Sequence, residues 1–280
     1  MPGGSASAEG ARYSRGVSAT TLPIPTDAGD LPGLLWLPED LEQPVPALVV
    51  LQEIFGLSDY LHQRCADLAA LGFAVLAPQL FARLDPPVVA IDDHEDFEGW
   101  LAEGMELTQA LPWERAEADA IAALGALRAH GAVDESRVGL AGFCYGGGLA
   151  FAATASAAEE DRPPAALVSY YGSALPALLD RADAVTVPSL HHFGTADSFI
   201  PLDQVERIRT AVTAGGEREQ VQFELHAGAG HAFDNPHPGL HHPAAAEAAW
   251  TQTRQFLAQT LVTGRSGAAP AADATSGLRP

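Results

Sequence analysis

Short apolar segments alternate with helical patterns along most of this chain, and this alternation constrains the fold more than any other feature. The expected strands cover residues 47–51, 73–77, 138–141, 165–171, 188–193 and 221–226. The expected helices cover residues 59–71, 114–130, 147–158, 202–214 and 244–262. Strands and helices that alternate in this way favour a parallel sheet with helices packed on both of its faces. We therefore predict the α/β fold class, with a mostly parallel sheet.

The domain organisation follows from length and composition. The chain has 280 residues, of which 47% are hydrophobic, enough for one sizeable core. Residues 1–18 and 264–280 are rich in small and polar residues, so we expect two disordered tails around a single domain at 19–263. Residues 84–100, LDPPVVAIDDHEDFEGW, fit neither pattern. Because loops after parallel strands surround the ligand crevice, this segment is interpreted as part of a substrate lid or as a solvated connection.

Charge and composition exclude several classes of partner. The formal net charge of −21 argues against nucleic acid, because phosphate binding needs clustered positive charge. No apolar run approaches the roughly 18 residues of a membrane span, and the N-terminus lacks the apolar core of a secretory signal. With only two cysteines the chain is not a disulfide scaffold, and a cytoplasmic location is expected. Whether the protein is a monomer or a homodimer stays open.

One short motif predicts a nucleophile. Gly142-Phe-Cys-Tyr-Gly146 lies between an expected strand and an expected helix, where the pattern G-x-nucleophile-x-G forms a strained turn. This turn lifts the middle side chain, here Cys144, above the sheet, and the start of the helix favours its thiolate. The alternative is that Cys144 is a small buried apolar residue, as free cysteines commonly are.

An acid and a base follow in the order that this turn requires. Asp197 lies in a glycine-containing loop just beyond one strand, and His231 lies in a glycine-rich loop after the next strand. In folds with the nucleophile turn, the acid precedes the histidine along the chain. Taken alone, Asp197 is interpreted as a turn residue and His231 as a solvated loop residue. Their order together with Cys144 favours a catalytic triad.

The segment Gln52-Glu-Ile-Phe-Gly56 converges on the same crevice. It follows the strand at 47–51, where this fold supplies one N–H of an oxyanion hole, and the second N–H comes from Tyr145 after the nucleophile. Glu53 needs a partner there, because a carboxylate between a buried strand and Ile54-Phe55 is costly to desolvate.

Five motifs in order resemble one family. QEIFG at 52–56, PQLFAR at 78–83, GFCYGG at 142–147, GTADSFIP at 194–201 and GHAFDN at 230–235 resemble the dienelactone hydrolases, or carboxymethylenebutenolidases, over about residues 20–262. The resemblance implies an α/β-hydrolase fold and no cofactor. The site residues that it implies are a Cys144–His231–Asp197 triad, Glu53 holding the resting thiol until substrate arrives, Ile54 and Tyr145 donating the oxyanion N–H groups, and Arg83 binding a substrate carboxylate.

The chain departs from the family pattern at the substrate. Family members acting on dienelactone have a second arginine shortly after the histidine, where this chain has His231-Ala-Phe-Asp-Asn235. Gln79 and Phe81 also replace residues that are more often Asp and Tyr. These departures weaken the expectation of a carboxylate-bearing lactone, but they leave the fold and the acyl chemistry unchanged.

Histidines also crowd this part of the chain without indicating a metal. His231, His237, His241 and His242 match no established ligand spacing, so no metal site is expected.

Two functions remain open from the sequence. The first is a hydrolase that opens a lactone or small carboxylic ester through a thioacyl-enzyme intermediate. The second is a protein of this fold without turnover, which binds a small molecule or senses oxidation through Cys144.

Overall fold

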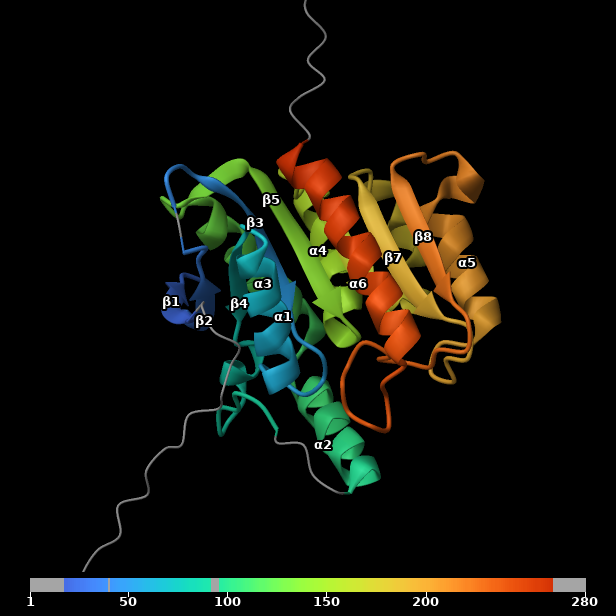
Figure 1. Cartoon of the computed structure of the whole chain (residues 1–280). Helices are drawn as coiled ribbons and strands as arrows, with labels where there is room; N and C mark the ends of the chain where they lie inside the picture. Colours follow the sequence, from blue (N-terminus) through green and yellow to red (C-terminus); the bar gives the residue numbers. More distant parts are fainter. Residues whose placement is uncertain (1–17, 40, 92–95, 264–280) are drawn as a thin grey trace, which may run out of the picture.

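One mixed sheet of eight strands forms the centre of the molecule (Figure 1). The computed structural model describes residues 18–39, 41–91 and 96–263, so the predicted tails lie outside the described residues, apart from Ser18. The strands are β1 (Thr20–Ile24), β2 (Leu31–Trp36), β3 (Val45–Leu51), β4 (Ala74–Pro78), β5 (Val133–Phe143), β6 (Leu167–Tyr170), β7 (Ser189–Gly194) and β8 (Val221–His226).

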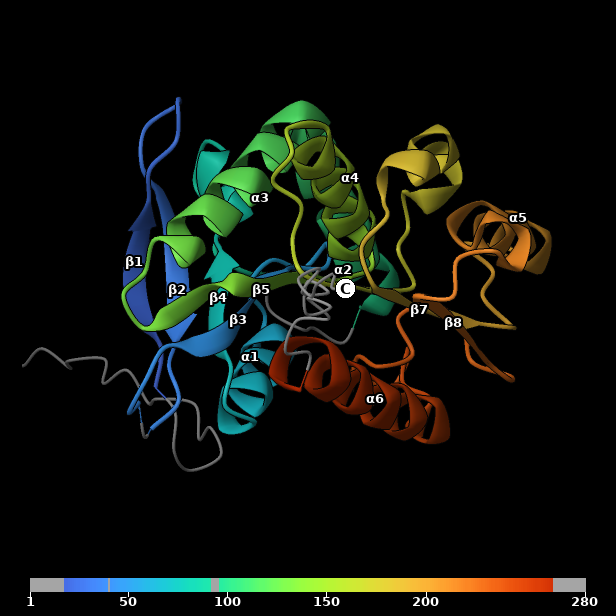
Figure 2. The ribbon, with the colours of Figure 1, turned by 90° about the horizontal axis from the view of Figure 1, so that it is seen from above.

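Helices cover both faces of this sheet. The α-helices are α1 (Asp59–Ala70), α2 (Phe97–Ala110), α3 (Trp113–Arg128), α4 (Tyr145–Glu159), α5 (Leu202–Val212) and α6 (Pro243–Leu257). Figure 2 shows α1 and α6 on one face and α3, α4 and α5 on the other. Short 3-10 turns include η1 (Leu80–Arg83), and α6 continues into a π-helical turn, η5 (Ala258–Val262). The predicted α/β class, with helices on both faces, is confirmed.

The strand order explains where the site lies. The order is β1-β2-β4-β3-β5-β6-β7-β8, in which β1, β2 and β4 pair antiparallel and every pair from β4 to β8 is parallel. The carboxyl ends of β3, β5, β6, β7 and β8 therefore meet at one edge of the sheet. The loops that leave this edge carry the predicted site residues.

The central strands are apolar because helices cover both of their sides. Residues 47–51 of β3 and 74–77 of β4 are fully buried, and Leu140 of β5 is as well. Within the described part of the chain, no helix is both long and apolar enough to cross a bilayer.

Two parts of the fold were not predicted. The first is the β1–β2 hairpin, in which Pro23 and Pro32 lie opposite each other. Proline cannot donate a ladder hydrogen bond and suits an edge strand such as β1, so it obscures the strand pattern.

The second is α2. Its first residues, 97–100, fall in the segment 84–100 that fitted neither the strand nor the helix pattern. The interpretation of that segment as part of a lid or as a solvated connection stays a prediction. The Asp96 side chain accepts a hydrogen bond from the Gly99 N–H at 3.1 Å and caps this helix. Residues 92–95 of the segment lie outside the described residues.

Candidate active site

The turn at Cys144 has the strained geometry that the motif predicts. Cys144 has φ 53° and ψ −113°, in a region that residues other than glycine rarely adopt. A Cβ at Gly142 would lie 2.0 Å from the Gly146 carbonyl oxygen, and one at Gly146 would lie 2.2 Å from the Leu51 oxygen. Only glycine fits at either position. The tight turn therefore places the Cys144 side chain between the end of β5 and the start of α4.

The structure brings Cys144, His231 and Asp197 together from three separate loops. The His231 Nε2 atom lies 3.1 Å from the Cys144 sulfur, and the His231 Nδ1 atom lies 2.8 Å from the Asp197 Oδ2 atom. The other Asp197 oxygen accepts the backbone N–H groups of Phe199 and Ile200 at 2.8 and 2.9 Å. The aspartate is thus fixed by its own loop and oriented toward the imidazole, as a triad requires.

The charge of His231 is set by its neighbours. Burial disfavours the imidazolium. The charge of Cys144, the hydrogen bonds of His231 with Asp197 and Cys144, and the charge of Asp197 outweigh burial and raise the pKa of His231 to about 10. A positively charged imidazole beside the sulfur stabilises a thiolate. This arrangement suits a thiolate–imidazolium pair.

The predicted oxyanion donors lie on segments that adjoin the nucleophile turn. Tyr145 is the first residue of α4, so its N–H has no acceptor within the helix. Ile54 follows β3, whose Leu51 oxygen lies against Gly146 of the nucleophile turn. Helix α2 covers this segment, because a Cβ at Gly104 would lie 2.9 Å from the Ile54 side chain and Trp100 stacks on Phe55 with ring centroids 3.6 Å apart.

Glu53 is completely buried, but its hydrogen-bond partners differ from the one that the resemblance implies. Its two carboxyl oxygens accept from Asn235 Nδ2 at 2.7 Å and from the Tyr171 hydroxyl at 3.3 Å, while the Cys144 sulfur contacts His231 instead. Burial raises the pKa of Glu53 to about 7, although hydrogen bonds from Asn235 and Tyr171 and the charge of His231 oppose that rise. The predicted hydrogen bond from the resting thiol is absent from this arrangement.

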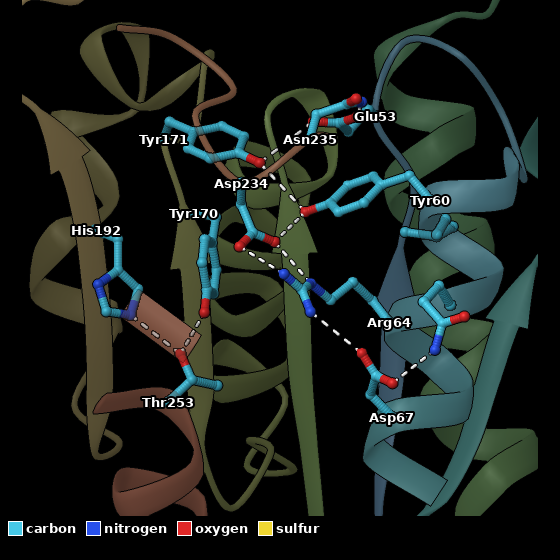
Figure 3. A network of polar contacts seen from close by, with 12 residues as sticks. Glu53, Tyr60, Arg64, Asp67, Tyr170, Tyr171, His192, Asp234, Asn235 and Thr253 are labelled. Atoms are coloured by element: carbon cyan, nitrogen blue, oxygen red, sulfur yellow. Dashed lines mark hydrogen bonds and ion pairs between the residues drawn. The ribbon is translucent and has the colours of Figure 1, made fainter. Parts of the chain in front are cut away.

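A buried polar network that the sequence did not predict continues from Glu53 (Figure 3). The Tyr171 hydroxyl lies 3.4 Å from the Tyr60 hydroxyl, and Tyr60 donates to Asp234 at 2.5 Å. Asp234 also accepts two hydrogen bonds from the Arg64 guanidinium, each of 2.7 Å. The only sequence signal for these residues is position, because Asp234 and Asn235 follow His231 closely and Tyr171 follows β6.

Arg83 is not brought together with the triad. Its guanidinium makes a bidentate pair with the buried Asp119 carboxylate of α3, with two distances of 3.0 Å. It also donates to the Thr26 hydroxyl and to the carbonyls of Ala28 and Gly29 in the β1–β2 turn. A substrate carboxylate would have to displace these partners, so the contacts count against the predicted role of Arg83, which stays a prediction.

A cavity of about 290 Å³ borders the polar network. Tyr60, Trp100 and Asn235 are among its lining residues, and the three triad residues are not. Among the described residues, no three His, Cys, Asp or Glu side chains gather as metal ligands would.

Sequence comparison identifies the family. The family model for the dienelactone hydrolase family matches residues 31–261, most of the chain. The chain belongs to this family. It is 32% identical to the carboxymethylenebutenolidase of Pseudomonas putida over 216 residues, covering 77% of this chain and 86% of that protein. It is 28% identical to a putative carboxymethylenebutenolidase of Methylorubrum extorquens over 254 residues, covering 88% and 82%.

Solved structures of the dienelactone hydrolase family have the same fold. A putative dienelactone hydrolase from Klebsiella pneumoniae superposes with a TM-score of 0.72 at 26% identity, covering 88% of this chain and all of that one. A dienelactone hydrolase-like promiscuous phosphotriesterase from metagenomic libraries superposes with a TM-score of 0.69 at 25% identity, covering 87% and 98%. The chain is therefore a hydrolase with the α/β-hydrolase fold.

Proposed function

We propose that this protein hydrolyses uncharged carboxylic esters or lactones, with Cys144 as the nucleophile. The observation that carries the proposal is the continuous contact from Cys144 through His231 to Asp197. Family membership supports acyl hydrolysis, and the relative from Pseudomonas putida is named as a carboxymethylenebutenolidase.

The reaction has two halves. The Cys144 thiolate attacks the carbonyl carbon, and the negative oxygen of the adduct accepts hydrogen bonds from the Ile54 and Tyr145 N–H groups. The adduct collapses to a thioester as the alkoxide leaves with the proton of His231 Nε2. Neutral His231 then takes a proton from water, which attacks the thioester and releases the acid and the Cys144 thiolate.

The two positions that would recognise a substrate carboxylate support an uncharged substrate. Arg83 is already paired with Asp119, and Asn235 stands where the family's second arginine is expected and donates to Glu53. A thiolate leaves readily from a tetrahedral adduct, so esters and lactones are favoured over amides.

Burst kinetics with a matched pair of esters test this proposal. We expect 4-nitrophenyl butyrate to be hydrolysed at least as fast as its anionic counterpart, mono-4-nitrophenyl succinate, and an acyl adduct to appear on Cys144 by intact-mass analysis. An arginine free to bind the carboxylate would instead favour the anionic ester by roughly ten- to a hundredfold in kcat/KM, the effect of one charged hydrogen bond.

The Cys144→Ala variant is the control for chemistry at the thiol. Loss of both burst and turnover in this variant is the expected result. Undiminished turnover in Cys144→Ala would exclude the triad mechanism. The absence of burst and turnover in the unaltered protein would instead favour the ligand-binding or redox-sensing alternative.

A further inference from the structure

Glu53 lies at the end of a hydrogen-bonded chain whose donors and acceptors can be assigned atom by atom (Figure 3). The chain runs from Glu53 through the Tyr171 and Tyr60 hydroxyls to Asp234 and Arg64. All five side chains are buried or largely buried, so each unpaired polar atom would be costly.

The far end of the chain is fixed. Asp234 has no exposed side-chain surface and pairs bidentately with Arg64, so it is an ionised carboxylate that only accepts hydrogen bonds. Tyr60 must therefore donate its single hydroxyl proton to Asp234, at 2.5 Å. The Tyr60 oxygen is left able to accept a hydrogen bond from Tyr171.

The Asn235 side of Glu53 is fixed as well. The Asn235 Oδ1 atom accepts the backbone N–H of His237 at 3.0 Å, which leaves its Nδ2 atom to donate to Glu53 Oε2. This oxygen of Glu53 accepts in either protonation state. A proton on Glu53 would therefore reside on Oε1, the oxygen that faces Tyr171.

Tyr171 is the variable link. Its hydroxyl lies 3.3 Å from Glu53 Oε1 and 3.4 Å from the Tyr60 oxygen. When Glu53 is ionised, Tyr171 donates to it. When Glu53 is protonated, Glu53 donates to the Tyr171 oxygen and the Tyr171 proton turns toward Tyr60.

We propose that Tyr171 and Tyr60 form a reversible hydrogen-bond relay that lets buried Glu53 exist either ionised or protonated with every polar atom paired. Asp234, held by Arg64, sets the direction of the relay. These four residues are positioning residues that act through Glu53. Any effect of these residues on turnover rests on the proposed function, because it would reach His231 through the charge interaction between Glu53 and His231. The relay itself can be tested without a substrate.

The relay predicts shifts of opposite sign for two similar substitutions. Tyr60→Phe removes the acceptor that Tyr171 needs when Glu53 is protonated, so the pKa of Glu53 should fall. Tyr171→Phe removes a hydrogen bond from Glu53 in both protonation states, but the bond to the ionised carboxylate is the stronger one, so the pKa of Glu53 should rise. We expect each shift to be about 0.5–1 pH unit, the effect of one hydrogen bond. The other titratable groups around Glu53, His231 and Asp234, are unchanged in both variants.

A carboxyl-¹³C-glutamate NMR titration of the substrate-free protein measures these shifts, with Glu53→Gln assigning the signal. Tyr170→Phe is the matched control, because the hydroxyl of this neighbouring buried tyrosine contacts Thr253 at 2.7 Å instead of the relay. Shifts of the same sign in both relay variants, no shift in either, or an equal shift in Tyr170→Phe would overturn the proposal.

A second measurement uses the unaltered protein, in case a variant does not fold. With ¹³Cζ-labelled tyrosine, the signals of Tyr60 and Tyr171 should change with the midpoint of the Glu53 titration, and the signal of Tyr170 should not. Signals of Tyr60 and Tyr171 that do not change with this midpoint would overturn the relay. A failure of the proposed function would appear separately, as the absence of an ester burst in a protein whose relay shifts are present.

Discussion

At the scale of single residues, the ring nitrogen that carries the proton decides whether His231 can act as a base. The Nδ1 atom of His231 faces Asp197, so its Nε2 atom is the one that faces the Cys144 sulfur. Asp197 is held in place by the Phe199 and Ile200 N–H groups, and this contact does not depend on its charge.

Asp197→Asn should therefore abolish most of the turnover without unfolding the loop. The amide oxygen can still accept the two loop N–H groups, while the new NH₂ group donates to Nδ1 and forces the proton of His231 onto Nε2. We expect kcat on an activated ester to fall by about 10⁴, as in serine triads. Asp183→Asn, the same change at an exposed aspartate paired with Arg218, should leave kcat unchanged. A wild-type rate for Asp197→Asn would contradict the assignment of the acid.

These three residues could be predicted because the order of nucleophile, acid and base, and the ends of the strands, can be recognised in the sequence itself. Cys144 directly follows β5, and Asp197 and His231 lie in the loops after β7 and β8; parallel strands bring such positions to one edge. Arg64 and Tyr60 carry no such signal, because they lie on one side of an ordinary amphipathic helix and meet Asp234 only through tertiary packing. Glu53 was predicted to need a partner, but Asn235 and Tyr171 could not be named from the sequence.

At the scale of elements, the strand–turn–helix of β5 and α4 depends on two glycines rather than on Cys144. A methyl group on Gly142 would collide with the Gly146 carbonyl oxygen at 2.0 Å, which is backbone and cannot rotate away. We expect Gly142→Ala to lower the free energy of unfolding by about 3 kcal/mol or more, measured by urea denaturation.

Gly125→Ala is the matched control for this substitution. Gly125 lies inside α3, and a Cβ there meets no atom within 4 Å. Alanine is a better helix former than glycine, so this variant should be more stable by about 0.5–1 kcal/mol. A Gly142→Ala protein as stable as the parent would show that the turn can relax and that its strain is not enforced by packing.

The elements that the sequence did not predict are those stabilised by tertiary contacts. Helix α2 contains Gly99 and Gly104, both poor helix formers, and its position depends on Trp100 stacking on Phe55 and on Gly104 packing against Ile54. The predicted strands β3 and β4 were found because residues 47–51 and 74–77 are continuous apolar segments buried on both sides. The β1–β2 hairpin lies at the sheet edge, where such a segment is not required.

At the scale of the whole molecule, buried charges link the two halves of the site. The Arg64–Asp234 pair joins α1 to the loop that carries His231, and Glu53 joins the end of β3 to the same loop through Asn235. Most of the charged residues are acidic, 36 Asp and Glu against 15 Lys and Arg, yet these few buried ones lie close to the proposed triad. Their protonation should therefore affect the stability of the fold as well as the chemistry of the site.

The sign of the pH effect follows from Glu53. Its pKa is about 7 in the folded protein, against an ordinary value of 4.5, because burial disfavours the carboxylate. Between these two values the folded state binds more protons than the unfolded state, so the contribution of Glu53 to stability falls as the pH rises. Glu53 lowers the free energy of unfolding by roughly 3 kcal/mol in total as the pH rises from about 4.5 to about 7. Above that range its contribution is constant.

Glu53→Gln removes this ionisation and should make the protein relatively more stable as the pH rises. We expect the unfolding free energy of Glu53→Gln minus that of the parent to increase by roughly 3 kcal/mol from pH 4.5 to pH 7 in urea titrations, and then to level off. Glu219→Gln makes the same change at an exposed position, where the side chain meets water in both states, so its difference should stay near zero. A difference for Glu53→Gln that is flat over this range, or that declines, would show that Asn235, Tyr171 and His231 stabilise the Glu53 carboxylate enough to offset its burial.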